Sequence, residues 1–183
     1  MMPDCDLKAL LVDLAGLDNR EIEELGRKLY LDLYLTHGHY GLHETHDGET
    51  LVFHARQFEH AFYASSDYRC HPDRKDILRP SSIERIHWIG QLVCGNVPGS
   101  ACFKIPSARE TGRPPKRLYA VYETPYVVWL EPRSHGGWKF SSAYPLSIEE
   151  IRAYTRGGST VWKKKNPVID GLTGEALSRV IKP

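Results

Sequence analysis

The sequence lacks an apolar run that approaches the roughly 20 residues needed to cross a lipid bilayer. It also lacks the start of a signal peptide, because Asp4 and Asp6 precede a short apolar stretch, whereas a signal peptide opens with basic residues. These two absences predict a protein without a membrane partner. The 183 residues, 41% hydrophobic and 26% charged, are instead typical of one globular domain with a sizeable core.

Cysteine is scarce and is not spaced for metal binding. The four cysteines lie far apart and form no C-x-x-C pair, which argues against a zinc ribbon and favours reduced thiols in the cytoplasm. A single bridge, such as Cys94 to Cys102, stays open. The P-loop, the Rossmann glycine fingerprint and the G-x-S-x-G nucleophile elbow are also missing. No cofactor is expected.

A strong excess of one charge sign is missing too, since the formal net charge is +1. The charges are nevertheless unevenly distributed. Residues 1–35 hold eight acidic and four basic residues, whereas residues 104–183 hold fourteen basic and seven acidic ones. The C-terminal part is therefore the better place to meet a polyanion such as nucleic acid. The alternative is that the two parts attract each other and bind nothing further.

Helical patterns are present in the first half of the chain. Asp18 predicts the capped start of an amphipathic helix over residues 18–35. A shorter helix is expected over residues 55–64. Ser81 predicts a second capping box, for a helix that ends near Gly95.

Strand patterns take over from Ser100 onward, where apolar residues alternate with period two and Pro or Gly pairs separate the segments. A short strand is also expected before the second helix, over residues 50–54. Helices first and sequential strands afterwards predict an α+β fold, with N-terminal helices packed on a roughly four-stranded antiparallel sheet. The four expected strands cover residues 101–105, 117–122, 126–131 and 138–144.

The whole chain, residues 1–183, is expected to form a single domain in three parts. Residues 1–48 form a helical segment that ends in a histidine-rich loop, and residues 50–146 form the core. Residues 147–183 are a basic C-terminal extension. Within the core, residues 65–80 are polar and contain two prolines, so an exposed loop is expected there.

The expected helix over residues 55–64 carries one polar face. Arg56, Glu59, His60 and Tyr63 recur at helical spacing, opposite two phenylalanines. An arginine holds an anion and an imidazole titrates near neutral pH, so this face suits proton transfer beside a phosphate. The alternative is an ordinary solvated face.

The next helix and the last expected strand offer further groups. Arg85 and Trp88 lie off the isoleucine stripe, where they suit a phosphate and a stacked base, although such a tryptophan can simply cover the sheet. On the strand, Ser142 and Tyr144 share a face with two large aromatic residues, and Lys139 lies on the other face. The two hydroxyls suit hydrogen bonds to a developing phosphorane, or the strand is only part of the core.

Four histidines form the cluster H-x-H-x-x-x-H-x-x-H, and two carboxylates lie among them or beside them. The spacing matches no metal motif with a known mechanism, such as H-E-x-x-H. A polar surface loop is the favoured interpretation. A metal-dependent hydrolase built on the cluster is the less favoured alternative, and its ligands would be His37, His39, His43 and His46.

Four segments together resemble one family. The segments TLVFHARQFEHAF, SSIERIHWIGQLV, YVVWL and WKFSSAYP are similar to the phage-type barnase/EndoU/colicin/RelE (BECR) nuclease domains, over roughly residues 50–146. The resemblance implies helices packed on a four-stranded antiparallel sheet. It also implies metal-independent cleavage of RNA, in which the ribose 2′-hydroxyl attacks the adjacent phosphodiester. RNA, tRNA included, is then the expected substrate, and an antitoxin or immunity protein is an expected partner.

The resemblance also implies roles for individual residues. His60 is the general acid or base, Arg85 binds the phosphate, and Ser142 stands where the family usually has threonine. Tyr144 completes the predicted catalytic set. The predicted substrate-binding residues are Arg56, Trp88 and Lys139, and no metal ligand is assigned. The alternative of another class is a catalytically inactive module of the same fold that binds a nucleic acid or a protein.

Overall fold

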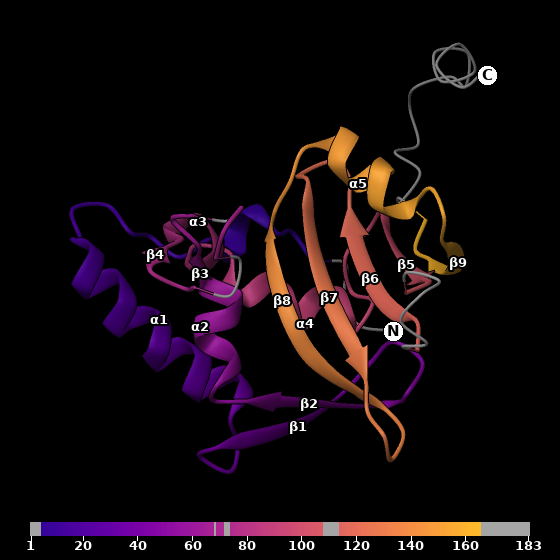
Figure 1. Cartoon of the computed structure of the whole chain (residues 1–183), viewed down its shortest axis with the longest axis horizontal. Coiled ribbons are helices and arrows are strands. Elements are labelled where there is room, and N and C mark those ends of the chain that lie inside the picture. Colours follow the sequence, from indigo (N-terminus) through magenta and orange to yellow (C-terminus); the bar gives the residue numbers. More distant parts are fainter. Residues whose placement is uncertain (1–4, 68, 72–73, 108–113, 166–183) are drawn as a thin grey trace.

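The computed structural model describes residues 5–67, 69–71, 74–107 and 114–165. Its main feature is a seven-stranded mixed β-sheet (Figure 1). In spatial order the strands are β1 (Tyr40–Glu44), β2 (Thr50–His54), β8 (Trp138–Pro145), β7 (Tyr126–Pro132), β6 (Lys116–Val121), β5 (Ser100–Ile105) and β9 (Ser159–Lys163). A separate small sheet pairs β3 (Tyr63–Ala64) with β4 (Ile77–Leu78). Strand β3 replaces the end of the helix expected over residues 55–64, and β4 lies inside the segment expected to be an exposed loop.

The predicted α+β class agrees with this arrangement, but the predicted four-stranded antiparallel sheet is wrong. The four expected strands are the centre of the sheet, β8-β7-β6-β5, and they are antiparallel to one another. The β1–β2 hairpin extends one edge, because β2 pairs with β8 in parallel. Strand β9 extends the other edge by pairing with β5. The sheet is therefore both wider and mixed.

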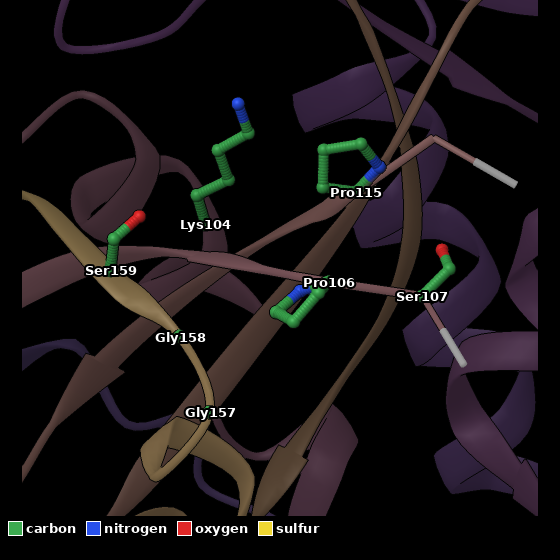
Figure 2. A pocket seen from close by; sticks show the side chains of 7 residues that line it. All are labelled: Lys104, Pro106, Ser107, Pro115, Gly157, Gly158 and Ser159. Carbon is green, nitrogen blue, oxygen red and sulfur yellow. The ribbon is translucent and has the colours of Figure 1, made fainter. Parts of the chain in front are cut away.

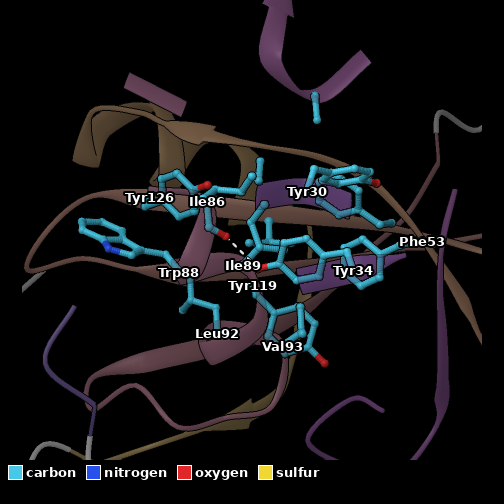
Figure 3. Close-up of a cluster of buried hydrophobic side chains, with 14 of the residues drawn as sticks. Tyr30, Tyr34, Phe53, Ile86, Trp88, Ile89, Leu92, Val93, Tyr119 and Tyr126 are labelled. Carbon is cyan, nitrogen blue, oxygen red and sulfur yellow. Dashed lines mark hydrogen bonds between the residues drawn. The ribbon is translucent and has the colours of Figure 1, made fainter. Parts of the chain in front are cut away.

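Helices lie on both faces of the sheet. Their bounds are η1 (Lys8–Leu10), α1 (Asn19–Tyr34), α2 (Gln57–Phe62), α3 (Pro80–Ile83), α4 (Ile86–Val93) and α5 (Ile148–Thr155). Apolar residues of α1 to α4 form the main core with one face of the sheet. Figure 3 shows part of this core, where the Tyr34 hydroxyl of α1 donates to the Ile86 carbonyl of α4 at 2.7 Å. Helix α5 covers part of the opposite face, where Ile151 is fully buried.

The predicted helix starts had different outcomes. Asp18 caps α1 as expected, in a reciprocal capping box with Glu21. Ser81 does not cap the later helix, because that helix begins at Pro80 and is divided into α3 and α4. Proline suits the first turn of a helix, where its missing N–H would have no partner in any case. Arg79 thereby becomes the residue that precedes α3.

A polar network holds the β1–β2 turn against the sheet. The Arg117 side chain of β6 is only 9% exposed, and its guanidinium donates to both Asp47 oxygens at 2.9 and 2.7 Å. Burial works to raise the pKa of Asp47, but hydrogen bonds from Arg117 and Thr45 outweigh it and lower the pKa to about 2. His46 shares a 2.7 Å hydrogen bond with the Tyr119 hydroxyl. The predicted surface loop is therefore a hairpin fixed to the sheet.

The C-terminal extension contributes to the same sheet within its described part. Residues 147–165 form α5, which begins in a capping box at Ser147, and β9. Residues 166–183 of the predicted extension lie outside the described residues. The cysteine bridge that the spacing left open is not formed, since the four cysteines are free thiols. No helix in the described ranges is long and apolar enough to cross a membrane.

Candidate nucleic-acid interface

A bulge in β8 decides which face its hydroxyls occupy. Ser142 pairs with Trp129, and Phe140 pairs with the next residue of β7, so Ser141 is left without a partner. Such an extra residue interrupts the alternation of side chains along a strand. Phe140 therefore faces the main core, whereas Tyr144 faces the opposite side of the sheet with Trp129. The predicted grouping of Phe140 with Ser142 and Tyr144 is wrong, and so is the predicted placement of Lys139 on the other face, but the two hydroxyl residues stay together.

An arginine and two aromatic rings surround Tyr144 on this second face. The Trp129 indole N–H donates to the Tyr144 hydroxyl at 3.1 Å, and the Trp129 ring meets the Tyr154 ring edge-on, 5.4 Å between centroids. The Arg79 guanidinium lies 5.4 Å from the centre of the Tyr144 ring. Burial and the nearby Tyr154 raise the pKa of Tyr144 to about 12. Its hydroxyl therefore keeps its proton at neutral pH.

A row of charges crosses the same face beside the bulge. The carboxylate of Glu131 lies between two ammonium groups, 2.7 Å from Lys116 Nζ and 2.9 Å from Lys139 Nζ. Burial works to raise the pKa of Glu131, but hydrogen bonds from the two lysines lower it to about 2. The row therefore holds two ammonium groups and one carboxylate, which leaves one net positive charge.

More positive charge gathers where β2 leads into α2. Burial lowers the pKa of His54, and the charges of Arg56, Arg133 and Lys139 lower it further. These three cations come from the β2–α2 connection, from the β7–β8 turn and from β8, so they meet only in the folded chain. A surface hollow lies beside them and is lined by His39, His54, Ala55 and Arg56. Close cations of this kind create a favourable potential for a phosphate chain.

Helix α2 carries His60 along the edge of β8. Gln57 at the start of this helix donates its amide to the Phe140 carbonyl at 2.9 Å, where β8 bulges. His60 follows Gln57 by three residues, about one helical turn, and its side chain is exposed. Glu59 turns toward α1, where it pairs with Arg27 at 3.4 Å. The structure thus brings α2, which carries His60, to the strand that carries Ser142 and Tyr144.

Two predicted site residues lie on the core side of the fold. Trp88 is 2% exposed, and its indole lies between the Arg85 guanidinium at 5.2 Å and the Tyr126 ring at 5.3 Å. Arg85 also donates to the Ser81 carbonyl at 2.8 Å and pairs with Glu84. A ring this buried offers no surface for a base to stack on, so Trp88 serves the core. The phosphate-binding role of Arg85 stays a prediction. In this structure its guanidinium contacts the Ser81 carbonyl and Glu84.

The histidine cluster is dispersed by the β1–β2 hairpin. His37 lies against Tyr40 before the hairpin, His43 packs against Phe53 within it, and His46 bonds to the sheet after β1. Among the residues that the structure describes, no three histidine, cysteine or carboxylate side chains gather in a way that would hold a metal ion. The donor geometry therefore gives no support to a hydrolase built on this cluster.

A second hollow lies at the far edge of the sheet, between β5 and β9. Figure 2 shows its lining residues, which are Lys104, Pro106, Ser107, Pro115, Gly157, Gly158 and Ser159. Lys104 is the single charged side chain among them. This lining offers neither a titratable group near neutral pH nor an aromatic ring, so it does not resemble the face around Tyr144.

Comparison of the chain with protein-family models, with curated proteins and with solved structures gave no match. Three residues around Tyr144, namely Arg79, Trp129 and Tyr154, carry no signal that the sequence pattern reveals. Arg79 ends a segment that reads as a loop, and the two rings depend on a strand register and a helix position that only the fold fixes.

Proposed function

We propose that this protein is a metal-independent endoribonuclease whose site lies on the face of β8 opposite the main core. One observation carries the proposal. The bulge in β8 directs Tyr144 to a face where Arg79 and Lys139 supply positive charge and where α2 runs along the strand edge. Hydroxyl donors, cations and a nearby imidazole are the groups that RNA transesterification requires.

The proposed reaction begins when the ribose 2′-oxygen attacks the adjacent phosphorus. The 2′-hydroxyl gives up its proton to a general base, the bond from phosphorus to the 5′-oxygen breaks, and that oxygen takes a proton. The products are a 2′,3′-cyclic phosphate and a 5′-hydroxyl, so no metal-bound water is consumed. We assign these transfers to His60, because histidine is the side chain most often used as a general acid or base near neutral pH.

The other residues stabilise charge in the pentacoordinate phosphorane. Arg79 and Lys139 offset its added negative charge, and the Ser142 and Tyr144 hydroxyls donate to its oxygens. The pKa of about 12 supports this role for Tyr144, because a phenol that stays protonated remains a donor. Arg56 lies with Lys139 in the cationic group near His54, where it would hold a neighbouring phosphate.

The test is cleavage of an end-labelled single-stranded RNA by the purified full chain in EDTA. We expect cleavage that ends in cyclic phosphate, and a loss of roughly 100-fold or more in kcat for His60→Ala. The matched control is His71→Ala, since His71 is an exposed histidine of the segment before β4. Urea unfolding of each variant checks that the fold persists.

Three results would overturn the proposal. Cleavage that appears only when a divalent metal is added would remove the metal-independent mechanism. Equal rates for His60→Ala and the wild type would remove His60 from catalysis. Tight binding of RNA with no cleavage of any strand would leave the binding module as the better description.

A further inference from the structure

We infer that the site around Tyr144 takes single-stranded RNA and stacks one unpaired base on the exposed ring of Tyr154. This inference deepens the proposed function and rests on it for the identity of the ligand. Helix α5 packs on the sheet and could bury a large apolar side chain there, yet Tyr154 is 45% exposed. Its ring stands edge-on to Trp129 at 5.4 Å, with an interplanar angle of 86°.

The local sequence explains why Tyr154 occupies this position. Ser147 and Glu150 form a reciprocal capping box that fixes the start of α5. Ile151 is then fully buried against the sheet and anchors the helix. Tyr154 follows Ile151 by three residues, so it flanks the buried line and lies at the margin of the covered area. There it meets Trp129, which is half-buried on β7.

Trp129 links this ring to the proposed phosphate site. Its indole N–H donates to the Tyr144 hydroxyl at 3.1 Å, and Tyr144 in turn lies under the Arg79 guanidinium. A series of contacts thus runs from the exposed Tyr154 ring through two half-buried rings to the Arg79 guanidinium.

This combination points to a single strand. Proteins that bind single-stranded nucleic acid pair a cationic track for the backbone with aromatic rings on which bases stack. In an RNA duplex the bases are stacked on one another and paired, so none is available to lie on an external ring. A phosphate held by Arg79 with its neighbouring base on Tyr154 therefore requires an unpaired nucleotide.

Another exposed tyrosine supplies the contrast. Tyr40, on the outer strand β1, is 42% exposed and lies beside the His37 ring at 5.0 Å. It belongs to the opposite end of the sheet from α5. Exposure of a ring alone therefore does not identify a stacking site. Tyr154 is proposed as one because Trp129 connects it to Tyr144 and Arg79.

The experiment measures binding without chemistry. A fluorescein-labelled 2′-O-methyl RNA keeps the ribose but lacks the attacking hydroxyl, so the wild-type full chain can bind it without cleaving it. Anisotropy titrations compare this strand with its duplex and with an abasic strand of equal length. The variants are Tyr154→Ala, Tyr154→Phe and, as the matched control, Tyr40→Ala.

We expect the single strand to bind more tightly than the duplex. Tyr154→Ala should weaken binding of the single strand by roughly 5- to 100-fold, the range found when one stacked base loses its ring. Tyr154→Phe keeps the ring and should retain most of the affinity, and Tyr40→Ala should change nothing. The abasic strand should bind Tyr154→Ala and the wild type equally, because it has no base to stack.

Equal affinity of Tyr154→Ala and the wild type for the single strand would overturn the inference, as would equal binding of strand and duplex. These outcomes are separable from failure of the nuclease proposal. If RNA is cleaved while Tyr154→Ala binds normally, the stacking inference is wrong and the nuclease proposal is kept. If Tyr154→Ala loses affinity while no RNA is cleaved, the stacking inference is kept and the nuclease proposal is wrong. Absence of binding to every strand would overturn both.

Discussion

The Gln57 amide donates to the Phe140 carbonyl at 2.9 Å, and this bond joins α2 to β8 where the strand bulges. Strand β2 pairs with β8 only along its first residues, 138–139. Beyond residue 139, α2 lies along this edge of β8 where a neighbouring strand would otherwise pair. The Gln57 amide there supplies the hydrogen bond that the Phe140 carbonyl would receive from a strand. The same contact ties α2, which carries His60, to the strand that carries Ser142 and Tyr144.

We therefore expect Gln57→Leu to affect both stability and catalysis. The Phe140 carbonyl loses its donor inside a packed edge, which should cost about 1–3 kcal/mol of unfolding free energy in urea titrations. Because α2 is then less firmly placed, kcat for RNA cleavage should fall while the affinity for 2′-O-methyl RNA is kept. Gln91→Leu is the control, since Gln91 bonds to Asn96 at the far end of α4. A similar fall in kcat for both variants would contradict the positioning role.

The charge row beside the bulge leads to a prediction about salt. If Lys139 contacts one phosphate, Lys139→Gln should weaken RNA binding and reduce the slope of log K against log salt concentration by about 0.7. Glu131 keeps Lys116 as its partner, so the fold should tolerate the change. Lys104→Gln removes the same charge from the distant hollow and should leave the slope unchanged. Equal slopes for the wild type and Lys139→Gln would remove this lysine from the interface.

Local patterns predicted the parts of the fold that local physics determines. The Asp18 capping box and the strand over residues 50–54 match α1 and β2 closely, and the four period-two segments match β5 to β8. Each of these elements can be predicted from the pattern of its own side chains. The two edge strands could not be predicted in this way. Strand β1 exposes its apolar residues Tyr40 and Leu42, β9 is mostly exposed, and both are held by pairing with a neighbouring strand.

The candidate site depends even more on tertiary structure. The sequence singled out His60, Ser142 and Tyr144, but it could not show the bulge, because that depends on how β8 is matched to β7. It also offered Trp88 as a stacking ring, beside the alternative that this residue covers the sheet, and packing buries it. The ring that remains exposed beside the site is Tyr154, and its position follows from how α5 docks on the sheet.

The network under the β1–β2 turn makes a prediction about stability. Arg117 is nearly buried, and two oxygens of Asp47 accept its N–H groups. Asp47 is 34% exposed, so water compensates part of its charge when Arg117 is removed. Arg117→Met should therefore cost about 2 kcal/mol of unfolding free energy, the range of a hydrogen bond to a charged group. Asp47→Asn should cost less, because it keeps an acceptor. In a double-mutant cycle the two losses should not add, and strict additivity would show that the residues are not coupled.

Acid sensitivity follows from the same pair. The pKa of Asp47 is 3.8 ordinarily and about 2 in the folded chain, so the folded state binds fewer protons than the unfolded state between those values. The stabilisation is fully present above about pH 4 and is lost as the pH falls through about 2. Asp47→Asn has no such proton to bind, so its stability should fall less steeply than that of the wild type over this window.

Urea titrations at pH 7, 4 and 2.5 and constant ionic strength would measure this difference. Glu131, whose pKa is also lowered to about 2, keeps part of the acid sensitivity in the Asp47→Asn variant. The wild type and the variant should therefore both lose stability below pH 4, and the wild type should lose more. Parallel losses in the two proteins would mean that the Arg117 contact does not depress the pKa of Asp47 in solution.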